Sequence, residues 1–108
     1  KYYKKNFDFI SNNEKSKIQN YNLKTITFEQ VVSQGIDIDY LSIDIEGGEM
    51  DLLKSINFNN NNIKIISLEN NTPVNLNFKN FFQNKKFIYF DRIGQDEIFY
   101  NSNFFKFD

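Results

Sequence analysis

The chain of 108 residues contains neither cysteine nor histidine. Without cysteine it can form no disulfide, thiolate nucleophile or cysteine zinc site, and without histidine it lacks the commonest general base and metal ligand. Any chemistry must therefore use carboxylates, amides, hydroxyls or tyrosine.

Strong net charge and long apolar runs are also absent. The formal net charge is −1, which gives no reason to expect nucleic acid or an anionic membrane as partner. No apolar run approaches the roughly 18 residues that span a bilayer, and no signal-peptide pattern opens the chain. We therefore expect a cytoplasmic protein whose many Phe and Tyr side chains pack in a core rather than stack on bases.

The length allows at most one domain. Residues 1–22 mix Lys, Asn and aromatic side chains without a clean period, which predicts an irregular or partly helical arm. The ordered domain is expected over residues 23–108. Because the chain begins with Lys1 rather than Met, we expect it to be a fragment.

The most informative stretch is residues 38–56, where an apolar run ends in two acids and two glycines. Residues 40–45 are apolar on both faces, which predicts a parallel strand covered by helices on both sides. Open α/β sheets bind ligands beyond the carboxyl ends of their strands, so Asp44 and Glu46 are candidates for chemistry. A helix should follow, with an inward side formed by Met50, Leu53 and Ile56.

The same pattern recurs in residues 63–68, an apolar strand that ends on Glu69. If this strand lies beside the first in parallel, Glu69 enters the same crevice as Asp44. The sequence therefore predicts three acids at one edge of the sheet.

Weaker signals complete the order of elements before the first of these strands. Residues 23–27 alternate as a short strand, and Thr27 and Gln30 have the spacing of a capping box for a helix that Gly35 would end.

After Glu69, residues 75–84 predict a short helix, and residues 87–90 and 97–100 predict two aromatic strands. The link of about six residues between these strands is too short for a parallel crossover, so they should pair antiparallel. The order strand, helix, strand, helix, hairpin predicts an α/β fold, namely the second half of a doubly wound sheet with an antiparallel edge.

Taken together, these residues resemble an FkbM-type methyltransferase. The family's strand motif resembles I-D-x-L-x-I-D-x-E-G-x-E, which the chain matches with Ile38, Asp39, Leu41, Ile43, Asp44, Glu46, Gly47 and Glu49. Leu68 and Glu69 match a second strand that ends in an acid, and residues 95–100 approximate a closing Gln-Asp-Asp-aromatic-Tyr element. The resemblance covers residues 21–101 and is to the C-terminal half of the domain.

The resemblance implies a partial Rossmann-like class I fold, S-adenosylmethionine as methyl donor, and an oxygen acceptor on a sugar or other small molecule. It implies that Asp44 and Ile45 contact the donor, and that the acceptor side is lined by Glu46, Glu69, Asn70, Gln95 and Asp96. The glycine-rich turn after a first strand and the acid after a second, which hold the donor in such folds, are absent. We therefore expect the chain alone to lack most of a cofactor site and to be inactive.

Methyl transfer to oxygen needs positioning and a nearby base, and Asp44 is the best placed candidate. Glu46 could hold the acceptor hydroxyl or share a divalent cation with Asp44, and Glu69 would act beside them. The plainer interpretations are a helix cap for Asp44, a turn residue for Glu46 and a surface acid for Glu69. We expect Glu49 to be structural in the first helical turn. Gly47 should serve backbone geometry, because a glycine there allows a positive φ or the close approach of a ligand.

Two other functions stay open from the sequence. The segments 37–39 and 44–46 resemble the acid-x-acid metal element of nucleotide-sugar glycosyltransferases, although that element is short and common. The chain could also be a remnant without catalysis that associates through an exposed strand edge.

Overall fold

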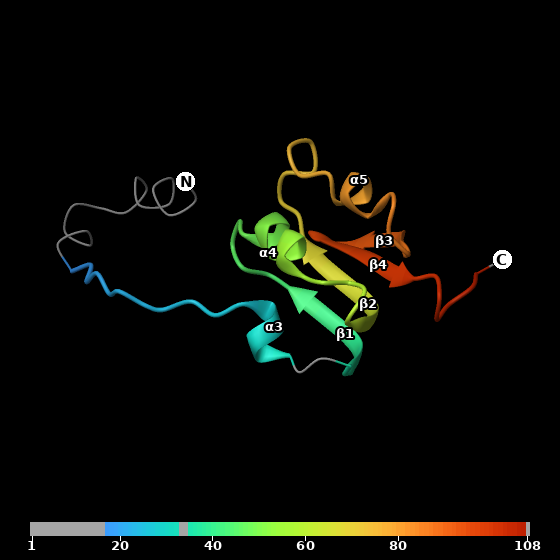
Figure 1. Ribbon diagram of the computed structural model, residues 1–108. Coiled ribbons are helices and arrows are strands. Elements are labelled where there is room, and N and C mark those ends of the chain that lie inside the picture. The colour runs from blue at the N-terminus through green and yellow to red at the C-terminus, as the bar shows by residue number, and fades with distance from the viewer. Residues whose placement is uncertain (1–16, 33–34, 108) are drawn as a thin grey trace.

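The computed structural model describes residues 17–32 and 35–107, so most of the predicted N-terminal arm lies outside the described residues. Four strands form one mixed sheet in the order β1-β2-β4-β3 (Figure 1). The result is a small α/β structure, as predicted, and it is consistent with part of a methyltransferase-like fold. None of the helices in the described ranges has the length and apolar character that a membrane span requires.

The sheet combines a parallel pair with an antiparallel hairpin. β1 (Asp37–Ile43) and β2 (Asn62–Glu69) run parallel and are joined through α4 (Glu49–Ser55). β3 (Phe87–Ile93) and β4 (Asp96–Asn101) form the hairpin, and β4 lies between β2 and β3. Both pairings were predicted. The predicted antiparallel edge is confirmed, because β3 is the outer strand on that side of the described sheet and pairs antiparallel with β4.

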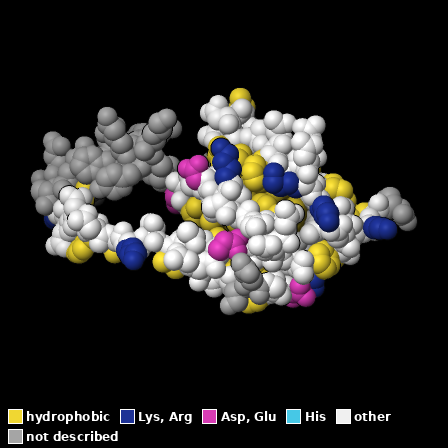
Figure 2. All heavy atoms as spheres, viewed as in Figure 1, with side chains coloured by type: hydrophobic (Ala, Val, Ile, Leu, Met, Phe, Trp, Pro, Cys, Tyr) yellow, Lys and Arg dark blue, Asp and Glu magenta, His cyan; other side chains and the backbone are white. Residues whose placement is uncertain are grey.

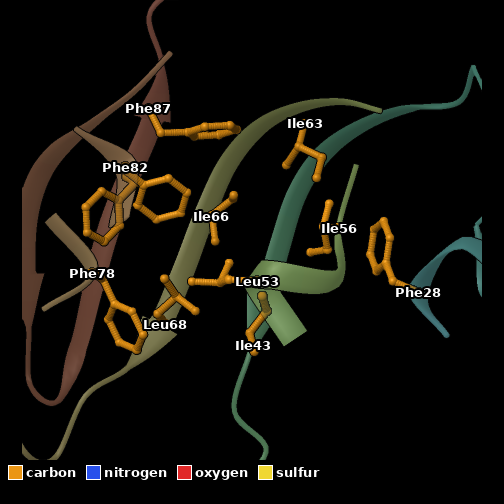
Figure 3. Packing of buried hydrophobic residues seen from close by; sticks show 11 residues of the cluster. Phe28, Ile43, Leu53, Ile56, Ile63, Ile66, Leu68, Phe78, Phe82 and Phe87 are labelled. Atoms are coloured by element: carbon orange, nitrogen blue, oxygen red, sulfur yellow. The ribbon is translucent and has the colours of Figure 1, made fainter. Parts of the chain in front are cut away.

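One face of the sheet carries the helices and the core. The register places Leu41, Ile66, Phe99 and Tyr89 in one row across the four strands. Against this face pack Leu53 of α4 and Phe78 and Phe82 of α5 (Phe78–Phe82), as Figure 3 shows. Met50, Leu53 and Ile56 contribute to this core, as predicted.

The opposite face is more open. Its adjacent row is formed by Tyr40, Ile65, Tyr100 and Ile88, and Tyr40 is 58% exposed. Phe105 and Phe107 from the C-terminal segment cover part of it and close a cavity of about 170 Å³. The prediction that residues 40–45 are covered on both faces is therefore wrong, because no helix within the described ranges lies over this side.

The segment before the sheet differs from its prediction. Residues 23–27 form no strand, and Leu23 is 87% exposed. Alternation alone does not make a strand when no partner strand offers hydrogen bonds, and none lies beside this segment in the described chain.

The capping box beyond this segment is confirmed. Thr27 Oγ1 accepts a hydrogen bond from the Gln30 N–H at 3.2 Å, and Gln30 Oε1 accepts one from the Thr27 N–H at 2.8 Å. The helix that follows, α3 (Phe28–Val31), ends before Gly35 because Val32 is already extended.

Several boundaries are also shifted. β1 ends at Ile43, so Asp44 and Ile45 lie just beyond it, and α5 is shorter than the predicted helix over residues 75–84. The hairpin link has two residues rather than six, because β3 runs to Ile93 and β4 begins at Asp96. Gly94, with φ of 61°, supplies the left-handed conformation that such a tight turn needs.

Candidate active site

Three carboxylates meet at the carboxyl ends of β1 and β2. Asp44, Glu46 and Glu69 each place an oxygen within 4.8 Å of the others, and we call these three residues the carboxylate cluster. Ile43 pairs with Leu68 in the parallel register, so the residues that follow the two strands emerge side by side. The predicted meeting of the three acids is confirmed, whereas their chemical roles stay predictions.

The other two acids of the cluster perturb the carboxyl group of Glu69. The pKa of Glu69 is raised, first because its side chain hydrogen-bonds with Asp44, and further by partial desolvation and the charges of Asp44 and Glu46. A hydrogen bond with Asn71 opposes this rise. A carboxyl group with a raised pKa holds a proton more readily than an isolated one, so Glu69 beside Asp44 is suited to share a proton.

The loop after β1 turns sharply and brings Glu46 back toward the strand ends. Glu46 has a φ of 57° and Gly47 a φ of 110°, so the positive φ that a glycine allows is present at Gly47. Gly48 is close to the side chain of Ile45, since a β-carbon on it would lie 3.1 Å from Ile45 Cδ1. The side chain of Ile45 therefore occupies the space beside Gly48, whereas residues 44–47 are exposed.

Glu49, in the first turn of α4, is only 2% exposed. Its Oε1 accepts hydrogen bonds from the N–H groups of Ile45 at 3.0 Å and Gly47 at 3.3 Å, and its Oε2 accepts one from Gly47 at 3.1 Å. Its predicted position in the helix is confirmed. These hydrogen bonds go to the loop before α4 rather than to the helix.

Asn70, predicted to bind the acceptor, lies inside the protein and is 0% exposed. Its Nδ2 donates to the Leu76 carbonyl at 2.8 Å and to Glu97 Oε2 at 3.2 Å, and its Oδ1 accepts from the Thr72 N–H at 3.2 Å. Its amide is therefore committed to internal contacts and does not reach the surface where the carboxylate cluster lies.

Sequence reasoning missed the two charged partners of this asparagine. Arg92 Nη2 donates to the Asn70 carbonyl at 2.8 Å, and Arg92 Nη1 lies 3.9 Å from Glu97 Oε1. The available signal was the chain's only arginine and an acid on opposite sides of a glycine turn, where a hairpin places them opposite each other. We call Asn70, Arg92 and Glu97 the polar hub.

The other predicted residues lie at the same edge of the sheet. Asp96 pairs with Glu69 in the β2–β4 register, and the Gln95 carbonyl accepts from the Asn70 N–H at 2.8 Å. The side chains of Ile45, Gln95 and Asp96 are exposed. The structure therefore places all three residues at the same edge of the sheet as the carboxylate cluster. Their contacts with donor or acceptor stay predictions.

Carboxylate oxygens are ligands that Mg²⁺ and Ca²⁺ accept, and the three acids present them within reach of one ion. Exposed acids gather in this way in many proteins that hold no metal, so we assign none here. A cavity of about 270 Å³ is lined by Asn62, Phe87 and Asn101 at the opposite ends of the strands. On the face in Figure 2, the Lys and Arg side chains gather mainly over the side with α5, and the acidic ones toward the side with β1.

Three comparisons with known proteins gave one match, to a family model. Neither the curated proteins nor the solved structures gave a match. A family model described as the methyltransferase FkbM domain matches residues 3–92, which include both parallel strands and all three acids of the carboxylate cluster. Because this match spans well over half of the 108 residues, the chain belongs to the FkbM methyltransferase domain family.

Proposed function

We propose that the chain is part of an S-adenosylmethionine-dependent methyltransferase that methylates a hydroxyl group of a small molecule or sugar. Family membership supports methyl transfer. The observation that carries the proposal is the convergence of Asp44, Glu46 and Glu69 within 4.8 Å at the edge of the sheet where α/β folds bind ligands.

In this proposal the carboxylate cluster prepares the acceptor. Asp44 accepts the proton of the acceptor hydroxyl, and Glu46 accepts a hydrogen bond that orients the same group. The proton taken by Asp44 is then shared with Glu69, whose carboxyl group lies beside it. S-adenosylmethionine, when bound, supplies a methyl group on a positively charged sulfur. The acceptor oxygen thus gains a methyl group and loses a proton to the carboxylates.

The described residues do not form an enclosed pocket for the whole donor. Asp44 and Ile45 lie at the surface, and Gly48 is packed against Ile45. The chain also lacks a glycine-rich turn of the dinucleotide-binding type. We therefore propose that most donor contacts come from sequence outside this chain, and that the chain alone is inactive.

Calorimetry with S-adenosylmethionine tests this proposal on two proteins: the chain itself and a longer polypeptide that includes the reading frame before Lys1. We expect the longer polypeptide to bind the donor one to one, and the chain alone to bind weakly or not at all. Because the outer edge of β1 has no partner strand in the described residues, we also expect light scattering to show that the isolated chain associates.

Two outcomes would contradict the proposal. Tight one-to-one binding by a monomer of the 108-residue chain would refute its dependence on further sequence. If the longer polypeptide binds a nucleotide sugar with manganese and not S-adenosylmethionine, glycosyl transfer replaces methyl transfer as the function.

A further inference from the structure

Two of the three acids in the carboxylate cluster do not lie on a strand. Asp44 is the first residue after β1, and Glu46 is two residues further along the loop. Glu46 reaches the cluster from a left-handed conformation, with φ of 57°, that is unfavourable for a residue with a side chain. Some contact must therefore stabilise this loop if the three carboxylates are to stay together.

Glu49 makes the contacts that suit this task. Its buried carboxylate accepts three hydrogen bonds from the N–H groups of Ile45 and Gly47, which flank Glu46 on both sides. Hydrogen bonds to an ionised carboxylate are roughly twice as strong as those between neutral groups. The hydrogen bonds of Glu49 hold the backbone in a bend at Glu46, and the side chain of Glu46 reaches the carboxylate cluster.

A role confined to the helix does not explain these contacts. Gly48, the N-cap residue of α4, makes no side-chain capping hydrogen bond. The hydrogen bonds of Glu49 go to Ile45 and Gly47, which precede the helix. Asp51 lies in the same first turn and is exposed. Asp51 therefore offers the same favourable charge to the helix without touching the loop.

We propose that Glu49 is a positioning residue, which holds the loop between Ile45 and Gly47 so that Asp44 and Glu46 meet Glu69. Its place in an active site rests on the proposed function, but its effect on the geometry of the three carboxylates does not. Glu49 is buried and its carboxylate is bonded to the loop, so in this proposal it acts through the loop.

The test uses nuclear magnetic resonance on the full chain, with two readouts. Exchange of the Ile45 and Gly47 amide protons reports the contacts of Glu49 directly. The titration of the Glu69 carboxyl, whose pKa is raised by Asp44 and Glu46, reports whether the cluster is assembled, because Glu69 is not a partner of Glu49.

Glu49→Gln and Glu49→Asp are the informative variants. Gln keeps the length and loses the charge, whereas Asp keeps the charge and is one methylene too short to reach the loop. We expect both to make the two amide protons exchange about tenfold faster or more. We also expect both to lower the pKa of Glu69 toward its ordinary value, while amide exchange in β2 and β4 stays as in the wild type.

Asp51→Asn is the matched control, because it removes one negative charge from the same helical turn. It should leave both readouts unchanged. The proposal is overturned if Glu49→Asp keeps the wild-type pKa of Glu69 while Glu49→Gln lowers it, since the effect would then be one of charge. It is equally overturned if, in the wild type, the Ile45 and Gly47 amide protons exchange as fast as those of exposed loops, a result that needs no variant to fold. Neither readout involves S-adenosylmethionine. The role of Glu49 can therefore be tested even if the proposed methyl transfer is wrong.

Discussion

The two parallel strands look alike in sequence and differ in structure. Each is an apolar run that ends in an acid. In the described part of the chain, β2 has a neighbour on both sides and β1 has one only on the side of β2. In the same row of the core face, Ile66 of β2 is fully buried, whereas its partner Leu41 of β1 is only half-buried. An apolar run therefore identifies a strand, while burial depends on which neighbours the strand finds.

The ends of the two strands are also held in different ways. The end of β2 is held by the polar hub and by β4, which pairs with it up to Glu69. The end of β1 continues into a loop whose conformation depends on Glu49. The carboxylate cluster thus joins one acid on a central strand to two acids on a loop, and its geometry is more easily disturbed from the β1 side.

The largest difference between the strands is expected in their contribution to stability. Ile66 and Leu41 are direct partners across β1 and β2, and Ile66 is buried while Leu41 is half-buried. We expect Ile66→Ala to lower the free energy of unfolding by about 3 to 4 kcal/mol, and Leu41→Ala by about 1 to 2 kcal/mol, because the cavity left at Ile66 is fully enclosed. Urea denaturation of both variants measures this.

Ile65→Ala is the control within β2, because Ile65 points to the open face and is only half-buried. Ile65→Ala should lower the free energy of unfolding by about as much as Leu41→Ala does. If Leu41→Ala and Ile66→Ala cost the same, the contrast between an edge strand and a central strand is wrong.

The polar hub provides the next largest effect. Asn70→Ala removes the hydrogen bonds to Leu76 and Thr72 and leaves Glu97 with one partner fewer in a buried position. We expect a loss of about 2 to 3 kcal/mol in the free energy of unfolding, because buried polar groups lose their partners. Asn71→Ala, at the exposed neighbouring position, should cost less than about 0.5 kcal/mol. Equal losses would show that the hub does not hold the end of β2.

Much of this arrangement was predictable from the sequence, because local patterns fix strand and helix identity. The runs that became β1 and β2, the inward side of α4 and the capping box at Thr27 all rest on short-range spacing. The meeting of Asp44 with Glu69 followed from one further rule, that parallel strands end at the same edge of a sheet.

The remaining features depend on contacts between distant residues. The residues next to Asn70 in the sequence do not predict its hydrogen bonds with Arg92 and Glu97, because a hairpin more than 20 residues later supplies both partners. The insertion of β4 beside β2 likewise depends on strand pairing over a long range. The same applies to residues 23–27, which have a strand pattern but no partner strand among the residues that the structure describes.

A smaller effect is expected from the side-chain link between the strands on the open face. The Tyr40 hydroxyl and Ser67 Oγ lie 2.6 Å apart, in a partly buried hydrogen bond from β1 to β2. Tyr40→Phe should lower the free energy of unfolding by about 1 kcal/mol. Combined with Ser67→Ala in a double-mutant cycle, the two changes should cost less than the sum of the single changes. Strict additivity would mean that the hydrogen bond contributes nothing to pairing.

The smallest effect on stability is expected from the interaction between Glu69 and Asp44 at the ends of β2 and β1. Glu69 is in contact with solvent, which screens this interaction. The pKa of Glu69 is raised, first by the hydrogen bond with Asp44. A raised pKa in the folded state means that the folded protein binds this proton more tightly than the unfolded chain does. Its contribution to stability is therefore complete below the ordinary carboxyl pKa and is lost as the pH rises through the raised pKa of Glu69.

Urea denaturation of wild type and Glu69→Gln over this pH range isolates the contribution of Glu69. The stability of the wild type relative to Glu69→Gln should fall as the pH rises, since Gln cannot titrate. In an Asp44→Asn background the same fall should be smaller and end at a lower pH, because the principal cause of the raised pKa is gone. A difference that grows with pH, or one that Asp44→Asn leaves unchanged, would mean that the loop after β1 does not deliver Asp44 to the end of β2 in solution.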